Sequence, residues 1–224
     1  MMTMFKQLFA IACLAIGALS ITTPALAQEA PDVLVKRITQ EVMDTAKHDK
    51  EIKAGNRTRI LEVVETRILP HVDLERTVAM AVGRHWREAT PQQRQRLTEE
   101  FRTMLIRTYA GALALVGDQK LEYKPLRDDP NDDEAEVRFE VRQLRGRDPV
   151  QVSYRLHKSP DGWKVYDVNV LGVWLVETYK SSFSAEIAKG GIDGLIRTLG
   201  DKNRELAVQK NGRGQATLRN AGTS

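Results

Sequence analysis

The side chains that could carry acid–base or metal chemistry in this chain are few and far apart. Its histidines are His48, His71, His85 and His157, and no two of them form an HExxH motif or an i, i+4 pair. His71 and Asp73 are two positions apart, and we consider them as a candidate acid–base pair. Because an aspartate just before an apolar periodic segment also caps helices, we expect a structural role for Asp73 and no metal or cofactor site.

Other sequence signatures of catalysis are missing too. The chain contains no Gly-x-Ser-x-Gly elbow, no GxxxxGK[ST] loop and no GxGxxG turn, and its single cysteine is Cys13. Its 34 Lys+Arg residues nearly balance 30 Asp+Glu residues, and the resulting net charge of +4 does not indicate nucleic-acid binding. We expect no catalytic residue. An exported enzyme that acts on a lipid or small apolar substrate through His71 and Asp73 is the alternative.

The N-terminal segment predicts export. Lys6 precedes an uncharged, largely apolar run from Gln7 to Leu26, and this run ends in Ala25-Leu26-Ala27. A charged start, an apolar centre and small residues at the end are the signature of a signal peptide. We therefore expect residues 1–27, which include Cys13, to be removed, and no transmembrane helix in the mature chain.

The first half of the remaining chain has the apolar spacing of helices. Asp73 is placed to cap one of them, and the Thr90, Pro91 and Gln93 pattern is that of a capping box with proline at the first helical position. From there a long amphipathic helix is expected to run to Gly117. The three helices expected before it cover residues 32–46, 56–69 and 73–82.

The pattern then changes to the alternation of half-buried strands. Val137, Phe139 and Val141 alternate with charged residues, and residues 150–157 alternate in the same way. With flanking strands over residues 121–126 and 163–170, this pattern predicts a four-stranded antiparallel meander.

Helical spacing returns after the strands. A stripe of large apolar side chains predicts a helix that Gly190 and Gly191 interrupt, and a last short helix is expected before Gly200. Residues 201–224 have few large apolar side chains, so we expect a disordered tail there. The stripe consists of Leu171, Leu175, Tyr179, Phe183 and Ile187. The order of elements predicts one α+β domain over residues 28–200.

Two blocks of sequence resemble the Mla-pathway periplasmic phospholipid carriers, also called the toluene-tolerance family. The likeness extends from about Val33 to Leu199. The first block comprises Leu69-Pro70-His71-Val72-Asp73, His85-Trp86, Thr90-Pro91 and the helix from Phe101 to Tyr109. The second and more specific block comprises Gly162-Trp163-Lys164-Val165-Tyr166-Asp167-Val168, Gly172-Val173, Leu175-Val176, Tyr179 and Phe183.

The chain departs from the family pattern near the second block. Leu171 stands where an acidic residue is usual, Trp174 where serine is usual, and Thr178 where asparagine is usual. Because tryptophan is much larger than serine, Trp174 is expected to narrow the mouth of a pocket or to alter a partner contact.

The resemblance implies a soluble carrier in the periplasm. Such a protein buries the acyl tails of a phospholipid in an apolar cavity that N-terminal helices, the sheet and C-terminal helices enclose. It exchanges the lipid with an outer-membrane lipoprotein–porin complex and with an inner-membrane ABC transporter that has an MCE-domain subunit, and so maintains outer-membrane lipid asymmetry. The phospholipid is cargo, and neither a cofactor nor a nucleic-acid partner is implied.

Besides the carrier and the exported enzyme, a ligand-free module that only bridges envelope complexes is a third hypothesis.

With the resemblance to the carriers, the apolar stripes become candidates for the lining of the cavity. The residues that we expect to contact the acyl tails are Tyr109, Leu113, Phe139, Val141, Val152, Tyr154, Val168, Val170, Val173, Leu175, Tyr179 and Phe183.

Overall fold

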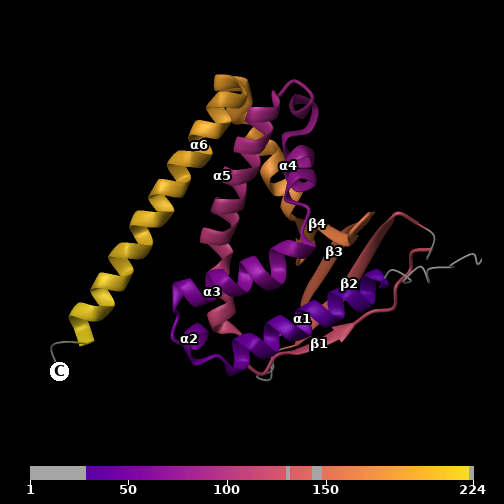
Figure 1. The fold of residues 1–224 in the computed structure, drawn as a ribbon, viewed down its shortest axis with the longest axis vertical. Helices are drawn as coiled ribbons and strands as arrows, with labels where there is room; N and C mark the ends of the chain where they lie inside the picture. The colour runs from indigo at the N-terminus through magenta and orange to yellow at the C-terminus, as the bar shows by residue number, and fades with distance from the viewer. Residues whose placement is uncertain (1–28, 130–131, 143–147, 222–224) are drawn as a thin grey trace, which may run out of the picture.

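A computed structural model describes residues 29–129, 132–142 and 148–221. The expected signal peptide, residues 1–27, lies outside the described residues. Figure 1 shows an antiparallel sheet with helix α1 (Pro31–His48) running across it. A group of helices lies beyond one end of the sheet: α4 (Leu74–Val82), α5 (Pro91–Tyr109) and α6 (Leu175–Ala221). The expected α+β class is therefore confirmed.

Two of the first three helices begin at a side-chain cap, whereas α1 follows Ala30 without one. Helix α1 spans Pro31–His48, and the short helices α2 and α3 span Lys50–Lys53 and Arg57–Val63. The Asp49 carboxylate accepts hydrogen bonds from the backbone of α2, and the Asn56 side chain accepts one at the start of α3. The helix expected over residues 56–69 continues past α3 only as a π-helical and then a 3₁₀ segment.

The caps expected for the next two helices are confirmed. Helix α4 spans Leu74–Val82, and the Asp73 side chain accepts a hydrogen bond from its backbone. After a 3₁₀ turn, helix α5 spans Pro91–Tyr109 and begins with a complete capping box between Thr90 and Gln93. The long helix differs from the prediction at its end, where Ala110–Leu115 tighten into 3₁₀ turns, as is common at helix termini.

The sheet is a meander with strands in the order β1-β2-β3-β4-β5, and every neighbouring pair is antiparallel. The expected four strands are present, and a fifth follows them after a tight turn. Leu171 and Gly172 form this turn with φ values of 53° and 86°. The apolar spacing predicted a helix from Leu171 onward, but α6 begins only after β5. The strands are β1 Lys120–Tyr123, β2 Glu134–Arg142, β3 Val150–Ser159, β4 Gly162–Val170 and β5 Val173–Trp174.

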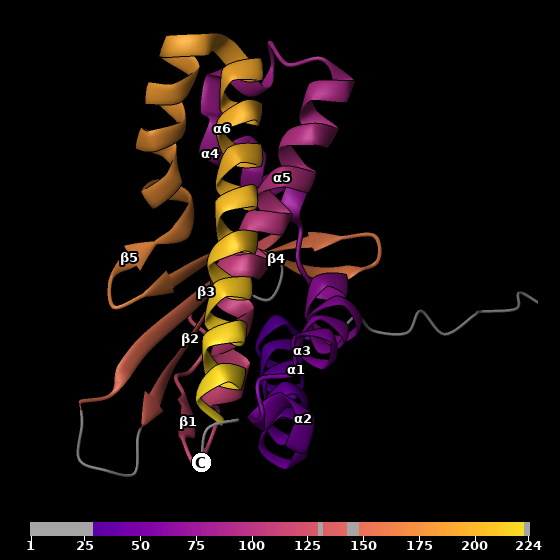
Figure 2. The same ribbon diagram turned by 90° about the vertical axis from the view of Figure 1, so that its left-hand side faces the viewer.

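Helix α6 spans Leu175–Ala221 and is interrupted at Gly190 and Gly191, as expected. At this point the chain reverses direction (Figure 2), and Thr198 on the second arm of α6 donates a hydrogen bond to Glu186 on the first at 3.1 Å. Helix α6 runs through residues 201–221, where a disordered tail was expected. Asn203 is only 4% exposed, and its side-chain amide donates to the backbone oxygen and the carboxylate of Glu100 at 2.9 and 2.7 Å. A polar anchor therefore ties the helix to α5 at Asn203, where few apolar residues are available.

The apolar side chains gather in separate clusters. One joins α4, α5 and α6, a second joins α1 to one face of the sheet, and a third joins α1, α2 and α3 to the 3₁₀ segment after α5. Within residues 29–129, 132–142 and 148–221, no helix combines the length and apolar character needed to cross a bilayer.

Candidate functional site

The register of the sheet places the expected strand residues on a single face. Side chains directly opposite each other in an antiparallel pair project from the same face. Phe139 is opposite Val152, which in turn is opposite Val170. We call this the inner face, and α1 covers part of it. Its members among the expected tail-contacting residues are Phe139, Val141, Val152, Tyr154, Val168, Val170 and Val173.

Along the row of the inner face that joins Phe139, Val152, Val170 and Val173, burial decreases from β2 towards β5. Phe139 is 3% exposed because it packs in the cluster that contains Leu34 and Val35 of α1. At the other edge Val170 is 45% exposed and Val173 is 62% exposed. Large apolar side chains are normally removed from water when a neighbouring element is available. The inner face thus has a part that protein covers and an apolar part that the described residues leave open.

The expected residues on the helices divide between the core and the surface. Leu113 packs against the third cluster, and Leu175 is half-buried at the first position of α6. Tyr109 is exposed at the end of α5. Phe183 lies inside the helical core, where its ring is 5.5 Å from that of Phe101, so it faces protein side chains. Tyr179 also stacks edge-on against Phe101, with the ring centroids 4.9 Å apart.

Aromatic rings form the middle of the inner face. The ring of Phe139 is 5.3 Å from the rings of both Tyr123 and Tyr154. Burial raises the pKa of Tyr154 to about 12, and burial together with the neighbouring Tyr109 hydroxyl raises that of Tyr179. Both hydroxyls are therefore neutral at physiological pH, and the inner face carries no charge from them.

A polar junction that was not predicted from the sequence lies on the opposite, outer face. Asp167 is 2% exposed, and its Oδ1 atom accepts hydrogen bonds from the backbone amides of Val168 and Val176 at 2.9 and 3.0 Å. It thereby ties β4 to the first turn of α6. Burial raises the pKa of its carboxyl, although Arg155 lies 3.8 Å away. The available signal was the acidic residue Asp167 between Tyr166 and Val168 in the β4 segment.

Trp174 belongs to this outer face as well. It is opposite Asn169 in the β4–β5 pair, and the Arg155 guanidinium lies 3.7 Å from the centroid of its ring. The expectation that Trp174 narrows the mouth of an inner pocket is therefore not supported by its position. The other expectation for Trp174, an altered contact with a partner protein, stays a prediction.

The acid–base pair considered for an enzyme does not form. The Asp73 carboxylate caps α4 and lies 2.7 Å from His157 Nε2, a residue far away in the sequence. His71 has a lowered pKa because of burial and the positive charges of Arg37 and Lys164. The arrangement of Asp73 is structural, and the pairing that supported an enzymatic alternative is absent among the described residues.

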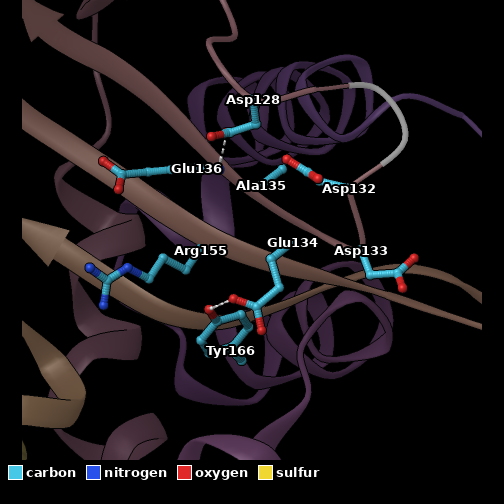
Figure 3. A pocket seen from close by; sticks show the side chains of 8 residues that line it. All are labelled: Asp128, Asp132, Asp133, Glu134, Ala135, Glu136, Arg155 and Tyr166. Carbon is cyan, nitrogen blue, oxygen red and sulfur yellow. Dashed lines mark hydrogen bonds between the residues drawn. The ribbon is translucent and has the colours of Figure 1, made fainter.

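A shallow acidic cavity of about 430 Å³ lies on the outer face (Figure 3). Two of its carboxylates have structural partners: Asp128 accepts from the Glu136 backbone at 2.7 Å, and the Tyr166 hydroxyl donates to Glu134 at 3.1 Å. In the described part of the chain, no group of three His, Cys, Asp or Glu residues could hold a metal ion. The lining residues are Asp128, Asp132, Asp133, Glu134, Ala135, Glu136, Arg155 and Tyr166.

A second cavity, of about 550 Å³, lies between α1 and β1, and we call it the α1–β1 cavity. It adjoins the inner face, because Leu121 and Tyr123 line it and pack in the same cluster as Phe139. Neither cavity is lined by the residues expected to contact acyl tails. The α1–β1 cavity is lined by Lys36, Gln40, Met43, Asp44, Lys47, Gly117, Gln119, Lys120, Leu121 and Tyr123.

A comparison with solved structures finds a protein of similar fold. The solved structure of a phospholipid-binding protein from Ralstonia solanacearum, in complex with a phospholipid, is similar with a TM-score of 0.76 and 42% sequence identity. The similarity covers 80% of this chain and 99% of that one.

Two curated relatives match most of the chain. The intermembrane phospholipid transport system binding protein MlaC of Haemophilus influenzae is 23% identical, over 85% of this chain and 90% of its own length. The toluene tolerance protein ttg2D of Pseudomonas putida is 27% identical, over 83% and 85% respectively. The sequence pattern of the MlaC protein family matches residues 36–201. The chain therefore belongs to the MlaC protein family.

Proposed function

We propose that this protein is a periplasmic phospholipid carrier whose cargo places its acyl tails on the open part of the inner face. The observation that carries the proposal is the gradient of burial across that face, from Phe139 at 3% exposed to Val173 at 62%. Apolar side chains that the fold leaves uncovered mark a binding site for an apolar partner. The phospholipid held by the similar Ralstonia solanacearum protein supports this choice of partner.

The energetics of acyl tails require such a surface. Two chains of roughly 30 methylenes in all would lose about 0.8 kcal/mol for each CH₂ exposed to water, or about 24 kcal/mol in total. Only extensive apolar contact offsets a cost of this size. We propose that the tails contact Val152, Tyr154, Val168, Val170 and Val173, with Tyr109, Leu113, Val141, Leu175 and Tyr179 around them. Phe139 and Phe183 are left out of this lining because protein side chains already cover them.

Transport is explained by the same physics. A phospholipid is equally stable in a bilayer, so its release requires a docked partner that offers an apolar environment. We propose that the outer-membrane lipoprotein–porin complex and the MCE-domain subunit of an inner-membrane ABC transporter are these partners, and that the carrier moves lipid between them without chemical change. The names of the two curated relatives, which refer to intermembrane phospholipid transport and to toluene tolerance, support this role.

Copurification tests the proposal directly. The full chain is expressed in a Gram-negative host, purified from the periplasm without detergent, and analysed by native mass spectrometry and solvent extraction. We expect a diacyl phospholipid on most molecules. Recovery from the cytosol, or a protein that carries no lipid under these conditions, would contradict the proposal.

A further inference from the structure

The α1–β1 cavity combines two kinds of surface. Its inner wall contains Leu121 and Tyr123, which belong to the apolar cluster under α1, and the ring of Tyr123 is 5.3 Å from that of Phe139. Its outer part contains Lys36 from α1 and Lys120 from β1, both exposed. In Figure 1 these two elements lie next to each other along the lower edge of the sheet. A molecule that fills the cavity therefore meets apolar carbon on one side and ammonium groups on the other.

The charges in the cavity favour an anion. Lys47 is neutralised by Asp118, with 2.6 Å between its Nζ atom and the carboxylate. Asp44 is the one acidic residue in the lining, and it accepts a hydrogen bond from the Gln40 amide at 2.9 Å. Within the described part of the chain, neither Lys36 nor Lys120 takes part in an ion pair. Two ammonium groups with three donors each are thus available to a phosphate.

The size of the cavity limits the ligand further. A volume of about 550 Å³ is within the range of sites for small molecules and is matched to a head group with the first carbons of its chains. Leu121 of the cavity wall lies opposite Val141 on the inner face, and Val141 is one of the residues that we have placed around the acyl tails. An acidic peptide would use the lysines and leave the apolar wall unoccupied. An anionic amphiphile uses both surfaces.

We propose that the α1–β1 cavity binds the phosphate of a phospholipid head group through Lys36 and Lys120, and that it thereby favours head groups with a net negative charge. This inference rests on the proposed carrier function, and it adds a selectivity that the apolar face alone does not provide. A phosphatidylglycerol head group carries a net charge of −1, whereas phosphatidylethanolamine adds an ammonium group that the two lysines repel.

Selective loading tests this assignment. The full chain is incubated with vesicles of equal parts phosphatidylglycerol and phosphatidylethanolamine, recovered, and extracted, and the bound lipids are quantified by mass spectrometry. The ratio of the two bound lipids is compared between the wild type and the double variant Lys36→Gln/Lys120→Gln. The matched control is Lys50→Gln/Lys158→Gln, which removes two exposed lysines outside the cavity.

The expected result is a fall of about tenfold in the ratio of phosphatidylglycerol to phosphatidylethanolamine for the cavity variant. The total lipid per protein should stay unchanged, and the control should keep the wild-type ratio. An unchanged ratio in the cavity variant, with lipid still bound, would overturn the head-group assignment and leave the carrier function intact. A wild type that takes up neither lipid would instead overturn the carrier function.

A free phosphate ion shares the chemistry of the head group, so a second measurement separates the two. Amide resonances of Gly117 and Leu121 are followed by NMR during titration with dihexanoyl phosphatidylglycerol or with inorganic phosphate. We expect saturable shifts with the lipid and none with phosphate at the same concentration. Equal shifts with both would show a site for the free ion and would overturn the proposal.

Discussion

The buried carboxyl of Asp167 allows a test of how the sheet is joined to α6. Replacing it with alanine removes the acceptor for the Val168 and Val176 amides, of which the second starts α6. A buried amide that loses its partner costs about 1–3 kcal/mol, so the two together should cost about 3 kcal/mol of unfolding free energy. In a chain of this size such a loss lowers the Tm by roughly 6–12 °C.

Replacement by asparagine separates the hydrogen bonds from the charge. Because burial raises the pKa of Asp167, the folded state holds its proton more tightly than the unfolded state. The stabilising contribution of this group is therefore fully present below its unfolded pKa and is lost as the pH rises through the folded pKa. At pH 7 the charge itself opposes folding, and Asp167→Asn keeps an oxygen acceptor while removing that charge.

Urea denaturation followed by circular dichroism measures both variants. We expect Asp167→Asn to be at least as stable as the wild type at pH 7, and Asp167→Ala to be about 3 kcal/mol less stable. Equal destabilisation by both would refute this reasoning. It would show that the negative charge, acting through Arg155 at 3.8 Å and the start of α6, outweighs the cost of its burial.

Three further predictions concern other parts of the fold. Asn203→Ala should lose both hydrogen bonds to Glu100 and about 1–3 kcal/mol of unfolding free energy. Limited proteolysis should then cleave after residue 200 before it cleaves the rest of the chain, and cleavage at the wild-type rate would contradict the anchoring role. His71→Gln should reduce the loss of stability that urea titrations measure between pH 7.5 and pH 5. The lowered pKa of His71 contributes stability at high pH that disappears as the pH falls through the folded pKa. Identical pH profiles for the variant and the wild type would show that His71 does not contribute. Leu171→Gly should raise the unfolding free energy by about 1 kcal/mol, since leucine is held at a φ of 53°, and a lower Tm would show that its side chain makes a stabilising contact.

Local rules predicted the helical half of the fold well. The Asp73 cap and the capping box at Thr90 depend only on residues within one turn, and both occur where the sequence placed them. Alternation predicted the four longer strands, because a sheet with one covered face needs a period of two. The resemblance of the block from Gly162 to Val168 identified the family.

The misses involve contacts that no local pattern contains. Strand β5 depends on Leu171 adopting a positive φ, a conformation that leucine disfavours, so helical spacing was the better local explanation. The hydrogen bond between His157 and Asp73 forms because the sheet places β3 next to the start of α4. The hydrogen bond from Asn203 to Glu100 forms because the chain reverses at Gly191. Periodicity placed the strand residues on one face of the sheet, whereas the burial of Phe183 between α4, α5 and α6 depends on tertiary packing.

The central claim is that acyl tails occupy the open part of the inner face, and a pair of tryptophan variants tests it most directly. Val170→Trp fills that face, whereas Gln151→Trp adds the same ring on the outer face, since Gln151 is opposite Glu140. Each protein is purified from the periplasm, and its lipid content is measured by native mass spectrometry beside a circular dichroism spectrum. We predict that Val170→Trp loses its phospholipid while it keeps the fold, and that Gln151→Trp retains the wild-type content. Unchanged lipid content in a folded Val170→Trp variant would contradict the placement of the tails.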